Sequence, residues 1–255
     1  MLEMHKDGTP VIRHIEDLFK EPTTKTVRMI GLVGDSNKGK TNTINHIINI
    51  FQTRAKDTQI AVFGIVRYIP NVLHIHTIEE LEKLRNTVVF IDEWADLVDT
   101  GNRRQMRSFE LSVRTIFQPH KNNIVILCGM ARNFNGKISG MLNAVIFKQT
   151  TLIDIVQRSV LANIMSEYST GFKVTKGKVL AMDDNIALIH IIGGHFDEVE
   201  IPYIEESDTK LGNPPIVKWD DETDVQPDTQ TDVQSDVQSD VQSSAQTRKT
   251  VKKKG

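Results

Sequence analysis

The sequence of 255 residues contains a single cysteine, Cys128, which excludes a disulfide bond within the chain. Cys128 stands inside an apolar run, so we expect a small buried hydrophobic residue rather than a nucleophile. The chain also lacks a secretory signal and any apolar stretch of about eighteen residues. We therefore expect no transmembrane segment, and a soluble protein of the cytoplasm.

A large excess of charge of one sign is also missing, since the formal net charge is -2. From Lys218 onward the chain has eight acidic and six basic residues; subtracting these from 33 and 31 leaves 25 of each sign in residues 1–217. This balance does not indicate a globally basic nucleic-acid-binding protein. Any contact with DNA must come from a local basic patch or from an assembled ring.

Eight residues after the apolar run at 27–33 match the pattern G-x-x-x-x-G-K-[ST]: Gly34, Asp35, Ser36, Asn37, Lys38, Gly39, Lys40 and Thr41. The two glycines let the backbone curl tightly enough to aim N–H groups at phosphates, and the following helix presents its positive end. Lys40 would reach the β- and γ-phosphates, and Thr41 would hold Mg²⁺. The pattern predicts a P-loop that binds ATP.

A second element, residues 87–94, is a continuous apolar strand that ends in Asp92 and Glu93. Such a strand is typical of a buried parallel strand whose carboxyl end opens on a site. Placed about fifty residues after a P-loop, it is similar to a Walker B element. Asp92 would hold Mg²⁺ and Glu93 would orient and deprotonate the attacking water, so we expect a Mg²⁺-dependent ATPase.

The remaining pattern predicts an α/β fold with a mainly parallel central sheet flanked by helices. Further strands are predicted at 60–66, 72–76, 123–128 and 144–148, and helices at 103–117 and 152–167. Residues 178–182 and 186–192 flank Asp183-Asp184-Asn185 and are predicted to form a β-hairpin, with another strand at 199–204. An inserted strand between the P-loop strand and the Walker B strand resembles RecA-like and AAA-type ATPases, and no guanine signature Asn-Lys-x-Asp occurs.

The sequence offers candidates for two further catalytic roles: a polar residue that senses the γ-phosphate, and an arginine that acts on the site of a neighbouring subunit. Asn133 or Arg132, after the strand at 123–128, would sense the γ-phosphate or would simply face solvent in a loop. Arg107 is the candidate for an arginine that acts in trans, with Arg132, Arg158 and three neighbours of Arg107 as further possibilities: Arg103, Arg104 and Arg114. The alternative for each arginine is an ordinary solvated side chain.

The composition divides the chain into an N-terminal helical extension at 1–22, an ATPase domain at 23–217 and a low-complexity tail at 218–255. The tail consists of Asp-Val-Gln-Ser/Thr units and ends in three lysines, and it has too few apolar residues to order itself. It is a solvated spacer, or its basic end binds nucleic acid.

In their order, these elements resemble the FtsK/HerA class of pumping ATPases over residues 27–204, and within it the genome-packaging ATPases of tailless viruses, including those of archaea. The resemblance implies a ring, a hexamer, that threads double-stranded DNA while hydrolysing ATP between subunits. It also implies a capsid or membrane-associated viral partner and a place in the host cytoplasm or in the virion. One departure is the absence of Gln after the strand at 123–128, where the class commonly has it. The alternatives are a Zot-like phage assembly ATPase and a non-hydrolytic nucleotide-binding scaffold or switch.

Overall fold

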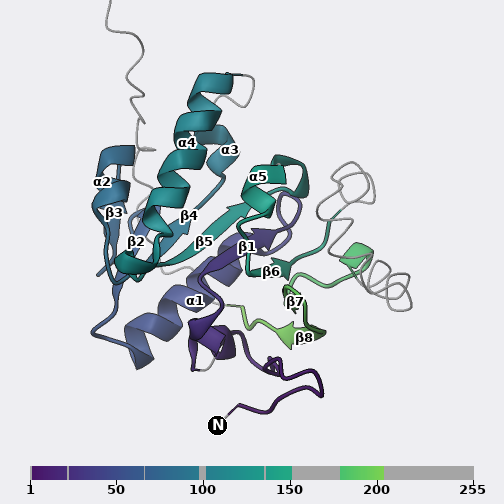
Figure 1. Ribbon diagram of the computed structural model, residues 1–255. Coiled ribbons are helices and arrows are strands. Elements are labelled where there is room, and N and C mark those ends of the chain that lie inside the picture. The colour runs from purple at the N-terminus through teal and green to yellow at the C-terminus, as the bar shows by residue number, and fades with distance from the viewer. Residues whose placement is uncertain are drawn as a thin grey trace, which may run out of the picture. The chain divides into compact units, whose positions relative to one another are not determined.

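The computed structural model describes residues 2–21, 23–65, 67–97, 102–134, 136–150 and 179–203 (Figure 1). The predicted helix at 152–167 and the tail at 218–255 lie outside these residues. The described strands are β1 Met29–Val33, β2 Gln59–Phe63, β3 Leu73–Ile75, β4 Thr87–Ile91, β5 Ile124–Gly129, β6 Ala144–Phe147, β7 Ile186–Ile191 and β8 Phe196–Glu200. The α-helices are α1 Lys40–Arg54, α2 Ile78–Lys83, α3 Trp94–Leu97, α4 Arg103–Ile116 and α5 Gly136–Ser139, and the 3-10 helices are η1 Ile15–Phe19, η2 Thr23–Lys25, η3 Pro119–Lys121 and η4 Ala131–Asn133.

The strands form one sheet in the order β3-β2-β4-β5-β1-β6-β7-β8. Neighbours from β3 to β6 are parallel, whereas β7 pairs antiparallel with both β6 and β8. The predicted mainly parallel sheet is therefore confirmed, and an antiparallel hairpin, β7-β8, follows its parallel part. Because β1 lies between β5 and β6, its carboxyl end, where the P-loop begins, is at the centre of the parallel part.

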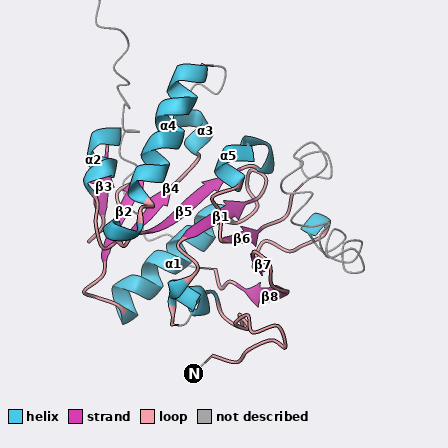
Figure 2. Ribbon diagram, viewed as in Figure 1, coloured by secondary structure: helices cyan, strands magenta, loops and turns pink. Residues whose placement is uncertain are grey.

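Helices cover both faces of the sheet (Figure 2). Side chains alternate along β1, so that Met29 and Val33 join one core cluster and Ile30 and Leu32 the other. The first cluster also takes side chains from α2, α3, α4 and α5, and the second takes those of α1 and η1. The buried spacing Ile44, Ile47, Ile48 and Phe51 on α1 is the helical period expected from the sequence.

The hairpin has other strands than the sequence predicts, because the predicted second strand at 186–192 is its first strand and pairs with β8. Residues 178–182 were expected to pair with 186–192, but Val179 and Leu180 are helical, and the Ile186 N–H donates to Asp183 O in a turn. The observed hairpin is β7-β8, closed by a turn in which Gly193 has φ 86. Glycine adopts this conformation without a Cβ penalty, so Gly193-Gly194 was the turn signal rather than Asp183-Asp184-Asn185.

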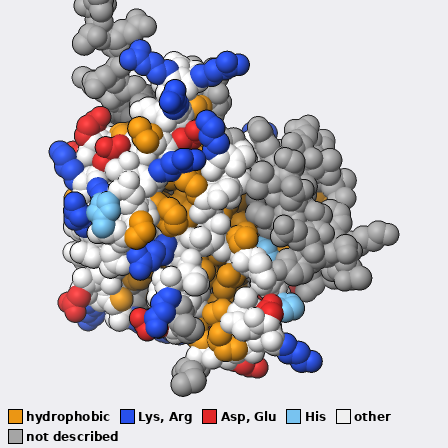
Figure 3. All heavy atoms as spheres, viewed as in Figure 1, with side chains coloured by type: hydrophobic (Ala, Val, Ile, Leu, Met, Phe, Trp, Pro, Cys, Tyr) orange, Lys and Arg blue, Asp and Glu red, His pale blue; other side chains and the backbone are white. Residues whose placement is uncertain are grey.

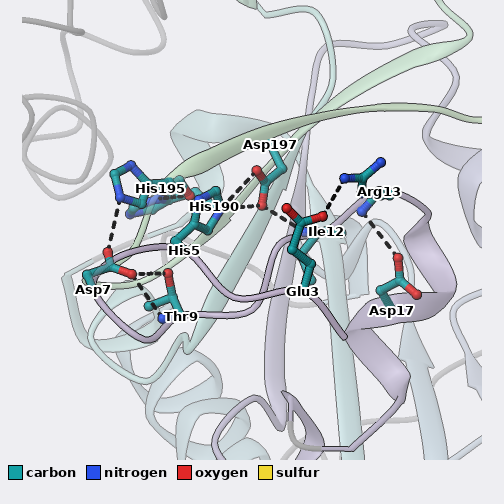
Figure 4. A network of polar contacts seen from close by, with 10 residues as sticks. All are labelled: Glu3, His5, Asp7, Thr9, Ile12, Arg13, Asp17, His190, His195 and Asp197. Carbon is teal, nitrogen blue, oxygen red and sulfur yellow. Dashed lines mark hydrogen bonds and ion pairs between the residues drawn. The ribbon is translucent and has the colours of Figure 1, made fainter. Parts of the chain in front are cut away.

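A polar network attaches the N-terminal segment to the hairpin (Figure 4). His5 Nε2 lies 3.1 Å from Asp197 Oδ1, and His195 Nε2 lies 3.2 Å from Asp7 Oδ2. The Thr9 hydroxyl and amide N–H both donate to Asp7 Oδ1 and lower the pKa of that carboxyl. Residues from opposite ends of the described chain thus contact each other beside β8.

Among the described residues, no helix is long and apolar enough to cross a membrane.

Candidate nucleotide-binding site

The loop between β1 and α1 has the backbone that its glycines predict. Gly39 precedes α1 with φ 76, and Asn37 has φ 60. A Cβ at Gly39 would lie 2.5 Å from Asp184 O, and one at Gly34 would lie 2.6 Å from Lys148 Cβ. Neither contact is sterically possible, so both positions require glycine. The loop leads directly into the N-terminus of α1, whose first N–H groups have no partner within the helix.

Lys40, the first residue of α1, is 5% exposed. Its Nζ donates to Asp35 O at 2.9 Å and lies 3.3 Å from Glu93 Oε1. The ammonium is therefore held at the mouth of the loop by one carbonyl and one carboxylate. The two residues that carry the P-loop and Walker B predictions, Lys40 and Glu93, contact each other although they are separated widely in the sequence.

Asp92 and Glu93 follow β4, as predicted. The Asp92 N–H donates to Phe63 O at 3.0 Å, and Asp92 Oδ1 accepts the Glu93 N–H at 3.0 Å. Glu93 has φ 40, a conformation that a residue with a Cβ adopts only at a cost. The next residue, Trp94, is fully buried and its ring stacks on Phe109 at 5.2 Å between centroids. This anchor holds Glu93 at the carboxyl end of the sheet.

Cys128 is buried inside β5, as the sequence predicts. Burial raises the pKa of its thiol well above the usual value, and the nearby Asp92 carboxylate raises it further. A thiol held neutral in this way does not act as a nucleophile or a metal ligand.

A pocket of about 620 Å³ opens at this end of the sheet. Its volume is within the range of small-molecule sites, roughly 300–1,000 Å³. The lining residues are Ser36, Asn37, Lys38, Gly39, Lys40, Thr41, Asn42, Glu93, Asp184, Asn185 and Tyr203. Six of these belong to the predicted P-loop and one to the predicted Walker B element. The sequence analysis did not assign Asn42, Asp184, Asn185 or Tyr203 to the site, because no motif marks them.

Lys148 was also not predicted as part of the site. It follows β6 and is fully buried beside the loop, where its Nζ donates to Asp184 O at 2.6 Å and to Ile186 O at 2.5 Å. Burial lowers the pKa of Lys148 to about 8, although the Asp184 carboxylate opposes the shift. Lys148 thus connects the strand next to β1 with the start of β7.

Of the candidates for the sensor and for the arginine in trans, those that the structure describes do not line the pocket. Asn133 is half-buried. Its Nδ2 lies 3.6 Å from the point that a Cβ would occupy if Gly129, at the end of β5, had a side chain. Arg132 is exposed. Arg107 lies on α4 with three other exposed arginines, Arg103, Arg104 and Arg114, in a region where basic side chains gather (Figure 3). Arg158 lies outside the described residues.

No protein-family model and no curated protein matches the sequence. Among solved structures, the genome packaging NTPase B204 from Sulfolobus turreted icosahedral virus 2, in complex with AMPPCP, is 13% identical with a TM-score of 0.45, and the match covers 69% of this chain and 98% of that one. B204, the DNA-packaging ATPase from Sulfolobus Turreted Icosahedral Virus, is 13% identical with a TM-score of 0.47, over 70% and 98%.

The cytoplasmic domain of EssC is 13% identical with a TM-score of 0.43, over 80% of this chain and 42% of that one. The resemblance to viral packaging ATPases inferred from the sequence is thus confirmed as a resemblance. At these identities and TM-scores, the likeness assigns no residue and no activity to this chain.

Proposed function

We propose that this chain is a Mg²⁺-dependent ATPase with a RecA-like core that works as a ring, a hexamer, to move double-stranded DNA, as in genome packaging. The observation that carries the ATPase proposal is the pairing of buried Lys40 with Glu93 in one pocket, at the N-terminus of α1. A buried cation, a carboxylate and a helix N-terminus are the groups that phosphoryl transfer to water requires.

The residues present fit a nucleoside triphosphate with its metal. The loop at 34–39 and the first turn of α1 supply backbone N–H groups for phosphate oxygens, and Lys40 supplies a compact cation. Thr41, in the pocket lining, and Asp92, next to Glu93, would provide the hard oxygen ligands that Mg²⁺ prefers. When bound, Mg²⁺ would neutralise the charge that develops on the phosphate oxygens.

The protein's own groups would act in a fixed order. Phosphate oxygens would replace Glu93 as the partner of Lys40, because the negative charges of the phosphate and of the carboxylate repel each other when both approach one ammonium. The freed Glu93 carboxylate would then orient a water molecule and accept its proton. Substrate binding would thereby release the base that the reaction needs.

The ring and the contact with DNA are proposed from the charged surface of α4. The exposed arginines of α4 form a local basic surface of the kind that a chain with balanced charge needs for contact with DNA. In this proposal Arg107 would complete the site of a neighbouring subunit. Asn133 or Arg132 would sense the γ-phosphate.

The test is ATP hydrolysis measured without DNA, with double-stranded DNA and with single-stranded DNA, beside the mass of the assembly. Stimulation by duplex DNA in a ring-sized assembly supports the motor. Stimulation by single strands alone supports a Zot-like assembly ATPase, and nucleotide binding without turnover supports a scaffold.

A further inference from the structure

The pocket extends beyond the phosphate loop to a wall that no motif predicts. This wall is made by Asp184 and Asn185, just before β7, and by Tyr203, shortly after β8. Tyr203 is 74% exposed, so one aromatic ring presents much of its surface to the pocket and to solvent. An exposed aromatic ring beside a phosphate cradle is the feature that a flat heterocyclic base can cover.

Hydrogen bonds fix this wall to the P-loop elements. On one side, Lys148 Nζ donates to the carbonyls of Asp184 and Ile186. On the other side, Asn42 Nδ2, in the first turn of α1, donates to Pro202 O at 3.2 Å, next to Tyr203. The distance from the phosphate loop to the wall is therefore set before any ligand binds, which reduces the ordering cost of binding.

We propose that Tyr203 is the base-stacking residue of the site and that the ligand is a purine nucleoside triphosphate, with its phosphates in the loop at 34–41 and its base on the tyrosine ring. A purine covers more of the ring than a pyrimidine does. Asp184 and Asn185 line the same wall, and carboxylate and amide oxygens are acceptors that suit the exocyclic amino group of a purine such as adenine. This inference rests on the proposed nucleotide site and adds the part that distinguishes one nucleotide from another.

The experiment compares two ligands that share phosphates and differ in the base: a non-hydrolysable ATP analogue and inorganic tripolyphosphate. Tyr203→Ala should weaken binding of the ATP analogue by about five- to a hundred-fold and leave tripolyphosphate affinity unchanged, because only the first ligand has a base to stack. Tyr203→Phe keeps the ring and should restore the affinity for the analogue. The wild-type preference for the ATP analogue over its UTP counterpart should shrink in Tyr203→Ala.

Two controls separate the possible failures. Tyr68 is 60% exposed and does not line the pocket, so Tyr68→Ala tests whether loss of any exposed tyrosine matters. Lys40→Ala should weaken both ligands. If Tyr203→Ala binds the analogue as the wild type does, or loses both ligands equally, the stacking role is overturned while the P-loop site stands. If the wild-type protein binds neither ligand, the proposed function itself fails.

Discussion

Lys40 Nζ and Glu93 Oε1 are 3.3 Å apart, and this ion pair joins the start of α1 to the end of β4. Lys40 is almost fully buried, whereas Glu93 is about one-third exposed, with a side-chain exposure of 36%. The lysine is therefore the fixed member of the pair and the glutamate is the one that solvent reaches. When a phosphate group takes the place of the Glu93 carboxylate next to Lys40, the ion pair would be lost and Glu93 would lie beside the substrate.

The first prediction concerns Lys40. Lys40→Ala should abolish ATP binding or turnover, because the phosphates would lose the compact cation at the mouth of the loop. Lys40→Arg should not restore activity fully, since a planar guanidinium does not replace an ammonium in a buried, narrow position. Equilibrium binding and turnover assays measure both effects. Hydrolysis by Lys40→Ala at the wild-type rate would show that the P-loop interpretation is wrong.

The second prediction separates the two acids after β4. Glu93→Gln should stop turnover because an amide cannot accept the proton of water. The variant should also bind ATP a few-fold more tightly, because ATP binding no longer has to break the ion pair between Lys40 and Glu93. A partly exposed ion pair contributes up to about 1 kcal/mol. Asp92→Asn should instead weaken Mg²⁺-dependent binding. Titration of ATP with and without Mg²⁺ distinguishes the variants, and identical affinity and residual turnover in both would contradict this division.

The third prediction concerns Arg107, which is exposed on α4. If it acts in trans, Arg107→Ala should lower turnover by about three to five decades while ATP binding and assembly persist. Arg85→Ala, at an exposed arginine between α2 and β4 that is not a candidate, is the matched control. Mixing Arg107→Ala with Lys40→Ala subunits should recover activity, because some sites would then combine an intact Lys40 with an intact Arg107 from the neighbour. A normal rate in the Arg107→Ala ring would eliminate this residue as the finger.

The parts of the site that lie close together in the sequence could be predicted. The loop at 34–41 depends on two glycines and a following helix, and the acids after β4 depend on a buried strand ending at an open edge. Both signals are local, so the sequence places Gly34, Lys40, Asp92 and Glu93 correctly on their elements. The parallel sheet follows from the same alternation of strands and helices.

The far wall of the pocket could not be predicted, because it depends on which strands pair at long range. Asp184 and Tyr203 meet the P-loop only when β7 adds antiparallel to β6 and β8 adds to β7. The sequence pattern instead paired residues 178–182 with 186–192, since both segments are apolar and flank an Asp-Asp-Asn turn. Lys148 was unexpected for the same reason. Its partners are the carbonyls of Asp184, in the turn before β7, and of Ile186, at the start of β7, and the sequence pattern places both in another hairpin.

The last prediction concerns Lys148 and pH. Burial lowers the pKa of Lys148 from 10.5 to about 8 in the folded protein. Between these values the unfolded chain keeps a proton that the folded protein has lost, so the free energy of unfolding should rise with pH in this window. The contribution is complete above about pH 10.5 and is lost as the pH falls through about 8. One proton gives a slope of at most about 1.4 kcal/mol per pH unit.

The neutral amine still has N–H donors for the carbonyls of Asp184 and Ile186, so the connection to β7 should persist at high pH. Lys148→Met removes the titrating group and leaves both carbonyls without their donor, so it should be less stable overall and should lack this rise. Denaturant unfolding of both proteins from pH 7.5 to 9.5 gives the difference, in which the titration of all other groups cancels. A constant difference across this range would mean that Lys148 keeps its proton, and that its role beneath the P-loop is that of a permanent cation.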